Sequence, residues 1–225
     1  MTRPILHKRA GGCGSSDNNS ESKVSASMLQ SVAASMLPLY RAVATNRGFA
    51  IKWSKAVVSA NLDLMNKLLS SAAPRAARQG LGINGIGYFI DFSYPRTVYT
   101  NGTTIPPGTV QFVFEPRVHQ AIARAVLPLY RKLACDRSFA CKLAIAIRRN
   151  NTWAVNALVR GVVCTTALKS VRIEDEGIAL SFKYSFSRFK YRNLLFRESI
   201  FIRRRRQKRR LRQRLRLKLH CMDEK

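Results

Sequence analysis

Residues 123–159, ARAVLPLYRKLACDRSFACKLAIAIRRNNTWAVNALV, repeat a stretch that stands 90 residues earlier, at 33–69, AASMLPLYRAVATNRGFAIKWSKAVVSANLDLMNKLL. Without a gap, 15 of the 37 aligned positions are identical, and the pentapeptide LPLYR occurs in both stretches. Chance alone would supply only a few identities. Self-similarity at a fixed period indicates that one structural unit occurs more than once. The sequence therefore predicts two tandem repeats with a period of 90 residues.

The same offset continues downstream, where it aligns GINGIGYFIDFSY at 82–94 with RIEDEGIALSFKY at 172–184. In the first of these runs Tyr88 and Phe92 lie on one side and polar residues on the other, which is the pattern of a half-buried strand. A further run, TVQFVFE at 109–115, alternates in the same way and predicts another strand. Each unit is thus expected to end in antiparallel strands.

Upstream of the strands the apolar spacing indicates helices. From Val118 to Leu129 the apolar residues of the second unit lie three or four apart, which gives one apolar helix face. Asn46 and Asp136 each stand three residues before a phenylalanine, where a short polar side chain can cap a new helix. Pro38 and Pro128 either kink the preceding helix or begin a new one, and the sequence does not choose between these.

These patterns predict an α+β fold with two to three short helices followed by antiparallel strands in each repeat. The junction between the copies is placed at TNGTTIPPG, which combines an Asn-Gly turn signal with two prolines. The expected divisions are a disordered N-terminal tail at 1–24, repeat 1 (helices then strand) at 25–99, an exposed hairpin loop at 100–108, repeat 2 (strand, helices, strands) at 109–200, and a polybasic C-terminal tail at 201–225.

The chain is strongly basic. Its 225 residues include 40 Lys and Arg against 12 Asp and Glu, which gives a formal charge of +28, while 46% of the residues are hydrophobic. That hydrophobic fraction is sufficient for a core and excludes a wholly unstructured polycation. Such a charge favours nucleic acid, an anionic polymer, anionic lipid or an acidic protein as partner.

The basic residues are most concentrated near the C-terminus. Between 203 and 218, 11 of 16 residues are basic and none is acidic. Together with two arginines that follow the second predicted helix of repeat 2, these cations are the expected polyanion-binding residues, through release of counterions from the partner. The full set is Arg203, Arg204, Arg205, Arg206, Lys208, Arg209, Arg210, Arg212, Arg214, Arg216, Lys218, Arg148 and Arg149.

No pattern predicts an enzyme. The histidines His7, His119 and His220 are isolated, which argues against a metal site. His119 is expected on a helix, at the surface or at the boundary between core and solvent. Acidic residues are too sparse for a catalytic carboxylate pair, since the one cluster, at 174–176, fits a solvated turn. The five cysteines form no C-x-x-C pair and are expected to be reduced. We assign no catalytic residue, cofactor or metal ligand.

The sequence also lacks the patterns typical of a transmembrane helix and of a secretory signal. No stretch approaches the ~20 consecutive apolar residues of a transmembrane helix. The first 23 residues lack the apolar run of a secretory signal. We therefore expect a protein without a transmembrane segment or signal peptide that resides inside the cell.

The segment FACKLAIAIRRNNTWAVNALV at 139–159, followed by TALKSVRIEDEGIALSF at 166–182, resembles a short module of small sporulation proteins of Bacillus relatives, some of them assigned to the inner spore coat. The similarity covers roughly 136–184 and, more faintly, 46–94. It implies a non-enzymatic structural or assembly role and supplies no active residues. Those proteins carry one module and no comparably cationic C-terminus, so the doubling and the tail need their own explanation.

The expected function is thus that of a structural or assembly protein, a spore coat component whose cationic tail binds an acidic protein or another polyanion and whose modules self-associate or dock in a layer. The alternative is a sequence-nonspecific nucleic-acid-binding protein that uses the basic second repeat and the tail. A third possibility is an interfacial membrane protein, because Leu211, Leu215 and Leu219 could line one side of a basic helix.

Overall fold

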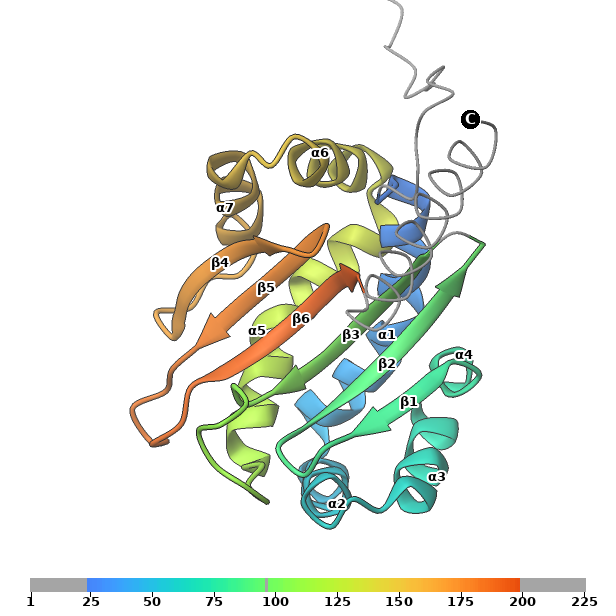
Figure 1. Cartoon of the computed structure of the whole chain (residues 1–225), viewed down its shortest axis with the longest axis vertical. Helices are drawn as coiled ribbons and strands as arrows, with labels where there is room; N and C mark the ends of the chain where they lie inside the picture. Colours follow the sequence, from blue (N-terminus) through green and yellow to red (C-terminus); the bar gives the residue numbers. More distant parts are fainter. Residues whose placement is uncertain (1–23, 96, 199–225) are drawn as a thin grey trace, which may run out of the picture.

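The computed structural model describes residues 24–95 and 97–198, which form seven helices and one six-stranded sheet (Figure 1). The first half of this region contains α1 (Ala26–Thr45), α2 (Arg47–Val58), α3 (Leu62–Ala72), α4 (Pro74–Ala77), β1 (Gly80–Ile83), β2 (Gly87–Tyr94) and β3 (Thr97–Thr104). The second half contains α5 (Pro116–Cys135), α6 (Arg137–Arg148), α7 (Thr152–Arg160), β4 (Leu168–Glu174), β5 (Gly177–Phe182) and β6 (Tyr191–Glu198). The predicted α+β class is therefore confirmed.

All neighbouring strands are antiparallel, and their order across the sheet is β1-β2-β3-β6-β5-β4. The two central strands, β3 and β6, come from different halves of the chain and pair with each other. The long helices α1 and α5 lie side by side against one face of the sheet (Figure 1). The shorter helices lie at the two ends, with α3 near β1 and α7 near β4.

The helices begin where the polar caps predict. Asn46 accepts a hydrogen bond from the backbone N–H of Phe49 at 2.9 Å, and Asp136 accepts one from Phe139 at 2.9 Å. These bonds satisfy N–H groups that have no partner within the first turn of a helix. Pro38 and Pro128 lie inside α1 and α5, so each of these 20-residue helices is continuous and longer than the short helices expected from the sequence.

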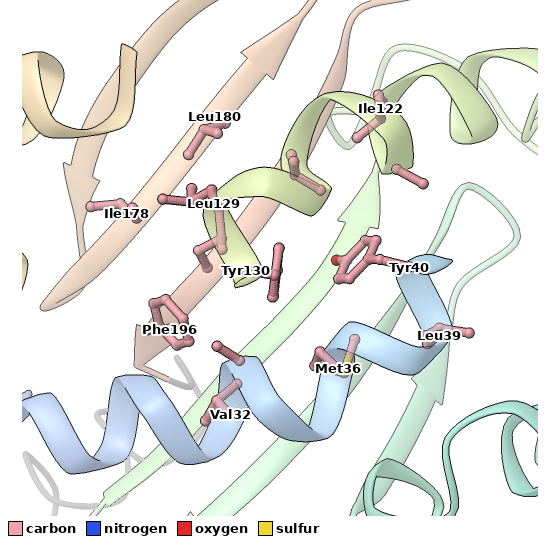
Figure 2. Packing of buried hydrophobic residues seen from close by; sticks show 14 of the residues in the cluster. Val32, Met36, Leu39, Tyr40, Ile122, Leu129, Tyr130, Ile178, Leu180 and Phe196 are labelled. Carbon is pink, nitrogen blue, oxygen red and sulfur yellow. The ribbon is translucent and has the colours of Figure 1, made fainter. Parts of the chain in front are cut away.

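A single hydrophobic core joins the two halves. The buried faces of α1 and α5 meet each other and the sheet, and Figure 2 shows Tyr40 of α1 and Tyr130 of α5 lying between the two helices. The rings of Tyr40 and Tyr130, the tyrosines of the two LPLYR stretches, have centroids 4.4 Å apart. The halves therefore share one interior rather than forming two separate cores.

A buried polar cluster, formed by Tyr40, Asn101, Tyr130 and Asn193, lies between the central strands and the long helices. The Tyr40 hydroxyl donates to Asn101 Oδ1 at 3.1 Å, and Asn101 Nδ2 donates to the Tyr130 hydroxyl at 2.7 Å. Asn193 Nδ2 donates to the Tyr40 hydroxyl at 2.8 Å. All four side chains are inaccessible to solvent. Because buried polar groups are costly unless they are paired, this cluster fixes how the two halves meet.

The exposed hairpin loop predicted at 100–108 is wrong for residues 100–104, whereas 105–108 are irregular and end in an exposed turn. Residues 100–104 belong to β3, and the connection from β2 runs between Tyr94 and Thr97. The Asn-Gly pair that indicated a turn lies within the strand instead. Asn101 belongs to the polar cluster, and Gly102 lies so close to β2 that a Cβ would stand 2.0 Å from the Tyr88 carbonyl oxygen. The strand therefore crosses the predicted boundary at 99.

The strand predicted at 109–115 is also wrong, because this segment is irregular and leads directly into α5. Only part of its alternation corresponds to burial, since Phe114 is buried whereas Phe112 is 66% exposed. The edge of β3 that a following strand could join is already paired with β6. The predicted tails at 1–24 and 201–225 lie outside the described residues, apart from Val24.

Candidate polyanion-binding surface

The described region is basic even without the tail. Residues 24–198 contain 24 Lys and Arg against 8 Asp and Glu, and 16 of those cations but only 5 of the acids follow residue 115. From Arg137 to Ile173 there are seven basic residues and no acidic one. This stretch spans α6, α7 and most of β4. The positive charge of the described region is thus concentrated at the β4 end of the sheet.

Two predicted polyanion-binding residues, Arg148 and Arg149, lie at the turn between α6 and α7. Arg148 is the last residue of α6, Arg149 is its C-cap, and both side chains are exposed. A cation is favoured at a helix C-terminus because the last carbonyl groups carry partial negative charge. This local stabilisation leaves the outward surface of both guanidinium groups available to a ligand. The other eleven predicted residues, Arg203 to Lys218, lie outside the described residues.

Trp153 stands just beyond this turn, in the first turn of α7, and is 81% exposed. Apolar spacing in the sequence does not indicate it, since the spacing that predicts a helix picks out core-facing residues, which in α7 are Val155 and Val159. The signal that could have identified it is the repeat alignment, in which Trp153 stands opposite Asp63. We call Arg148, Arg149 and Trp153 the α6–α7 corner.

The turn that carries the α6–α7 corner has the same backbone as the turn between α2 and α3. Asn150 and Ala60 both adopt φ of 52°, in the left-handed region. The next residue in each case, Asn151 or Asn61, donates its N–H to the alanine carbonyl five residues earlier at 2.9 Å and caps the following helix with its side chain. The positions of the corner therefore have geometrical counterparts in the first half: Val58, Ser59 and Asp63.

Side chains of α7 attach this helix to the outer edge of the sheet. Arg160 donates to the carbonyl oxygens of Leu168 and Lys169, each at 3.3 Å, and Asn156 donates to the carbonyl oxygen of Val171 at 3.1 Å. These bonds satisfy backbone groups of β4, an edge strand that would otherwise present them to solvent or to another chain. Arg160 is thus engaged with the backbone, whereas the two arginines at the turn extend into solvent.

His119 is buried, contrary to the expected surface or boundary position. Its Nε2 lies 3.1 Å from the Tyr88 hydroxyl, and its ring contacts that of Phe114 at a centroid distance of 5.0 Å. Burial lowers the pKa of His119 to about 3, because desolvation penalises the imidazolium form. The side chain is therefore a neutral member of the core, out of reach of a dissolved ligand.

Residues 24–95 and 97–198 contain no group of three or more His, Cys, Asp or Glu side chains that could hold a metal ion. None of the helices in the described part of the chain is both long enough and apolar enough to span a bilayer. Comparison with known protein families, curated proteins and solved structures found no match.

Proposed function

We propose that the protein is a non-enzymatic scaffold built from two tandem copies of one helix-then-sheet module, and that it binds a polyanion through its second copy and its polybasic tail. The duplication is supported by the element bounds, since α5 and α6 begin and end 90 residues after α1 and α2. The sheet register also supports it, because residues 90 apart occupy corresponding strands. Tyr88 of β2 pairs with Thr103 of β3, and Ile178 of β5 pairs with Leu195 of β6.

The same register brings Asn101 and Asn193 to equivalent places in the two copies. Each stands two residues before the strand partner just named, and each follows a tyrosine by two residues, in YTN at 99–101 and YRN at 191–193. A duplicated module whose copies pair through β3 and β6 explains why both asparagines reach the polar cluster. In this account the first copy has only a structural role, while exposed positive charge has accumulated on the second copy.

The observation that carries the polyanion proposal is the accumulation of exposed cations without acids between residues 137 and 173. Exposed cations without nearby carboxylates in the sequence attract a polyanion because binding releases the counterions condensed on it. A solvated surface that served only solubility would have no need to exclude carboxylates over 37 consecutive residues. The tail adds eleven further cations to the net positive charge of the chain.

The salt dependence of binding tests this proposal. Heparin, duplex DNA and poly-glutamate would be titrated against the full chain, against a chain lacking residues 203–218, and against Arg148→Ser/Arg149→Ser, with neutral dextran as the control polymer. We expect at least one polyanion to bind, with affinity falling by about 10³- to 10⁵-fold between about 50 and 200 mM salt if about six to ten anionic groups are contacted. Failure of every polyanion to bind at low salt would contradict the proposal.

We place this scaffold in the spore coat as a further part of the proposal, on the strength of the resemblance at 136–184 to the sporulation module. A fluorescent fusion to the full chain should then move to the surface of the developing spore. A fusion that remains diffuse throughout sporulation would remove this cellular setting and leave the polyanion proposal intact.

Association with nucleic acid is the second candidate function. One observation favours it over an acidic protein partner: the α6–α7 corner combines two exposed arginines with an exposed tryptophan. Carboxylates of an acidic protein would pair with the arginines and leave the indole ring without a matching group. A nucleic acid offers both phosphates and flat base faces.

A further inference from the structure

We infer that the α6–α7 corner is a binding site for single-stranded nucleic acid, in which a base stacks on Trp153 while Arg148 and Arg149 contact phosphates. The inference rests on the proposed polyanion binding and names the class of polyanion. It concerns a site of three side chains on a defined turn, which is distinct from the diffuse attraction of the tail.

The exposure of Trp153 is the first argument. Tryptophan carries a large apolar ring, and leaving 81% of it in water forgoes most of the stabilisation that burial would give. The other large apolar side chains exposed in the described region lie on other elements, at Ile51, Leu62, Phe112 and Phe186. Trp153 is therefore the one large apolar side chain of α7 that is exposed.

Because α7 exposes one large apolar side chain, the possible classes of partner can be distinguished. A membrane surface is bound by a helix that buries a continuous apolar face in the boundary region, and α7 presents no second large apolar side chain beside Trp153. A protein interface has a buried centre made of several apolar groups. A stacked base needs one aromatic face and a nearby cation for its phosphate, which is the combination that the corner offers.

The position of Trp153 at a helix N-terminus adds to the attraction for phosphate. It is the second residue of the nine-residue helix α7, and the aligned peptide dipoles give this end partial positive charge. Arg149 lies four residues before it, on the other side of the turn capped by Asn151. The turn has a left-handed backbone at Asn150 and is closed by the hydrogen bond from Asn151 N–H to the Ala146 carbonyl oxygen.

The corner favours a single strand over a duplex. In a duplex the base faces are stacked on each other, and a protein side chain reaches them only by unstacking a step at a cost of a few kcal/mol. A single strand presents free base faces, each of which can stack on an indole ring without regard to sequence. Duplex DNA is therefore expected to bind only through the arginines and the tail.

The first half supplies a built-in comparison. At the equivalent turn Val58 and Ser59 replace the arginines and Asp63 replaces the tryptophan. A carboxylate at that position would repel a phosphate backbone. Since the two turns share their backbone geometry, the difference between them is one of side chains alone, and substitutions can be copied from one turn to the other.

Tryptophan fluorescence gives a selective readout, because the chain has two tryptophans and the other, Trp53, is fully buried. Single-stranded oligo(dT) of about 12 nucleotides, within the range covered by single-stranded binding sites, should quench Trp153 on binding to the full chain. The comparison ligands are an abasic strand of the same length, duplex DNA, heparin, poly-glutamate and anionic phosphatidylserine vesicles.

The decisive variant is Trp153→Ala. Because this variant lacks the reporting fluorophore, isothermal titration calorimetry compares its binding with that of the parent chain. We expect it to weaken oligo(dT) binding by about 5- to 150-fold, to leave abasic-strand and heparin binding unchanged, and to be largely rescued by Trp153→Phe. Arg148→Ser/Arg149→Ser should weaken every polyanion. The matched control Arg75→Ser/Arg78→Ser, which removes the same charge from exposed positions of the first half, should have a smaller effect. Thermal unfolding of each variant confirms that it is folded.

The outcomes separate this inference from the proposed function. Equal binding of oligo(dT) by Trp153→Ala and the parent chain would overturn the inference, as would a loss of poly-glutamate or vesicle binding that exceeds the loss for oligo(dT). Salt-sensitive binding of the other polyanions would then still support the scaffold proposal. If no polyanion binds at low salt, the scaffold proposal and the inference fail together.

Discussion

Asn101 shows why a residue pattern can be read in two ways. As part of Asn-Gly it carries a strong turn signal, yet its amide joins Tyr40 and Tyr130 in the buried polar cluster. Local propensity favours the turn, whereas two hydrogen bonds to tyrosines from distant helices favour the strand. The tertiary partners prevail because an unpaired tyrosine hydroxyl in this core would cost about 1–3 kcal/mol.

His119 gives the fold a pH dependence of defined sign. The pKa of His119 is about 3 in the folded protein and about 6.5 in an exposed chain. Below neutral pH the unfolded state therefore binds a proton that the folded state does not bind. The stability it supports is therefore lost as the pH falls from about 6.5 towards 3. Burial also raises the pKa of Asp91, which acts in the opposite direction, so the histidine has to be isolated by substitution.

We predict that His119→Gln, which keeps a polar partner for Tyr88 but does not titrate, removes part of this acid sensitivity. Between pH 7 and pH 4.5 the free energy of unfolding of the parent chain should fall by about 2.5 kcal/mol more than that of the variant. Urea unfolding at the two pH values measures the difference. Equal losses in both proteins would mean that His119 is solvated or protonated in the folded state.

Helix α7 has two roles, because its first turn carries Trp153 of the α6–α7 corner and other side chains cover the edge of β4. Asn156 and Arg160 occupy carbonyl groups of the edge strand that another sheet could otherwise pair with. This arrangement opposes self-association through β4. If the scaffold assembles with itself, the contact is expected elsewhere on the surface.

Removing these contacts should expose the edge. We predict that Asn156→Ala/Arg160→Ser associates in a concentration-dependent manner, measured by sedimentation, while the parent chain does not do so through this edge. Arg149→Ser serves as the control, since it removes one charge without freeing a carbonyl of β4. A double variant with the sedimentation behaviour of that control would show that the edge is protected by other means.

The sequence predicted the helices better than the strands. Caps at Asn46 and Asp136 and the apolar spacing of α5 are local signals, and the structure confirms them. The position of β3 depends on partners about 90 residues away in β6, and no local pattern reports that pairing. Trp153 was missed for a related reason, because apolar periodicity finds residues that face the core and passes over an aromatic ring that faces solvent.

The shared core explains the division of roles that we propose for the whole molecule. The 90-residue offset indicated two units, but it could not indicate whether they would form two bodies or one. Pairing of β3 with β6 and packing of α1 on α5 unite them, so one stable body presents two turns of equal geometry and opposite charge. In this account the ligand distinguishes the turns by their side chains.

Hydrogen exchange of the full chain, with and without single-stranded oligo(dT), locates the bound ligand on this body. Our account predicts slower amide exchange across residues 148–160 when the oligonucleotide is bound, and unchanged exchange across the equivalent residues 58–70. Protection of 58–70 to the same extent, or unchanged exchange at 148–160 under conditions where the oligonucleotide is bound, would contradict it.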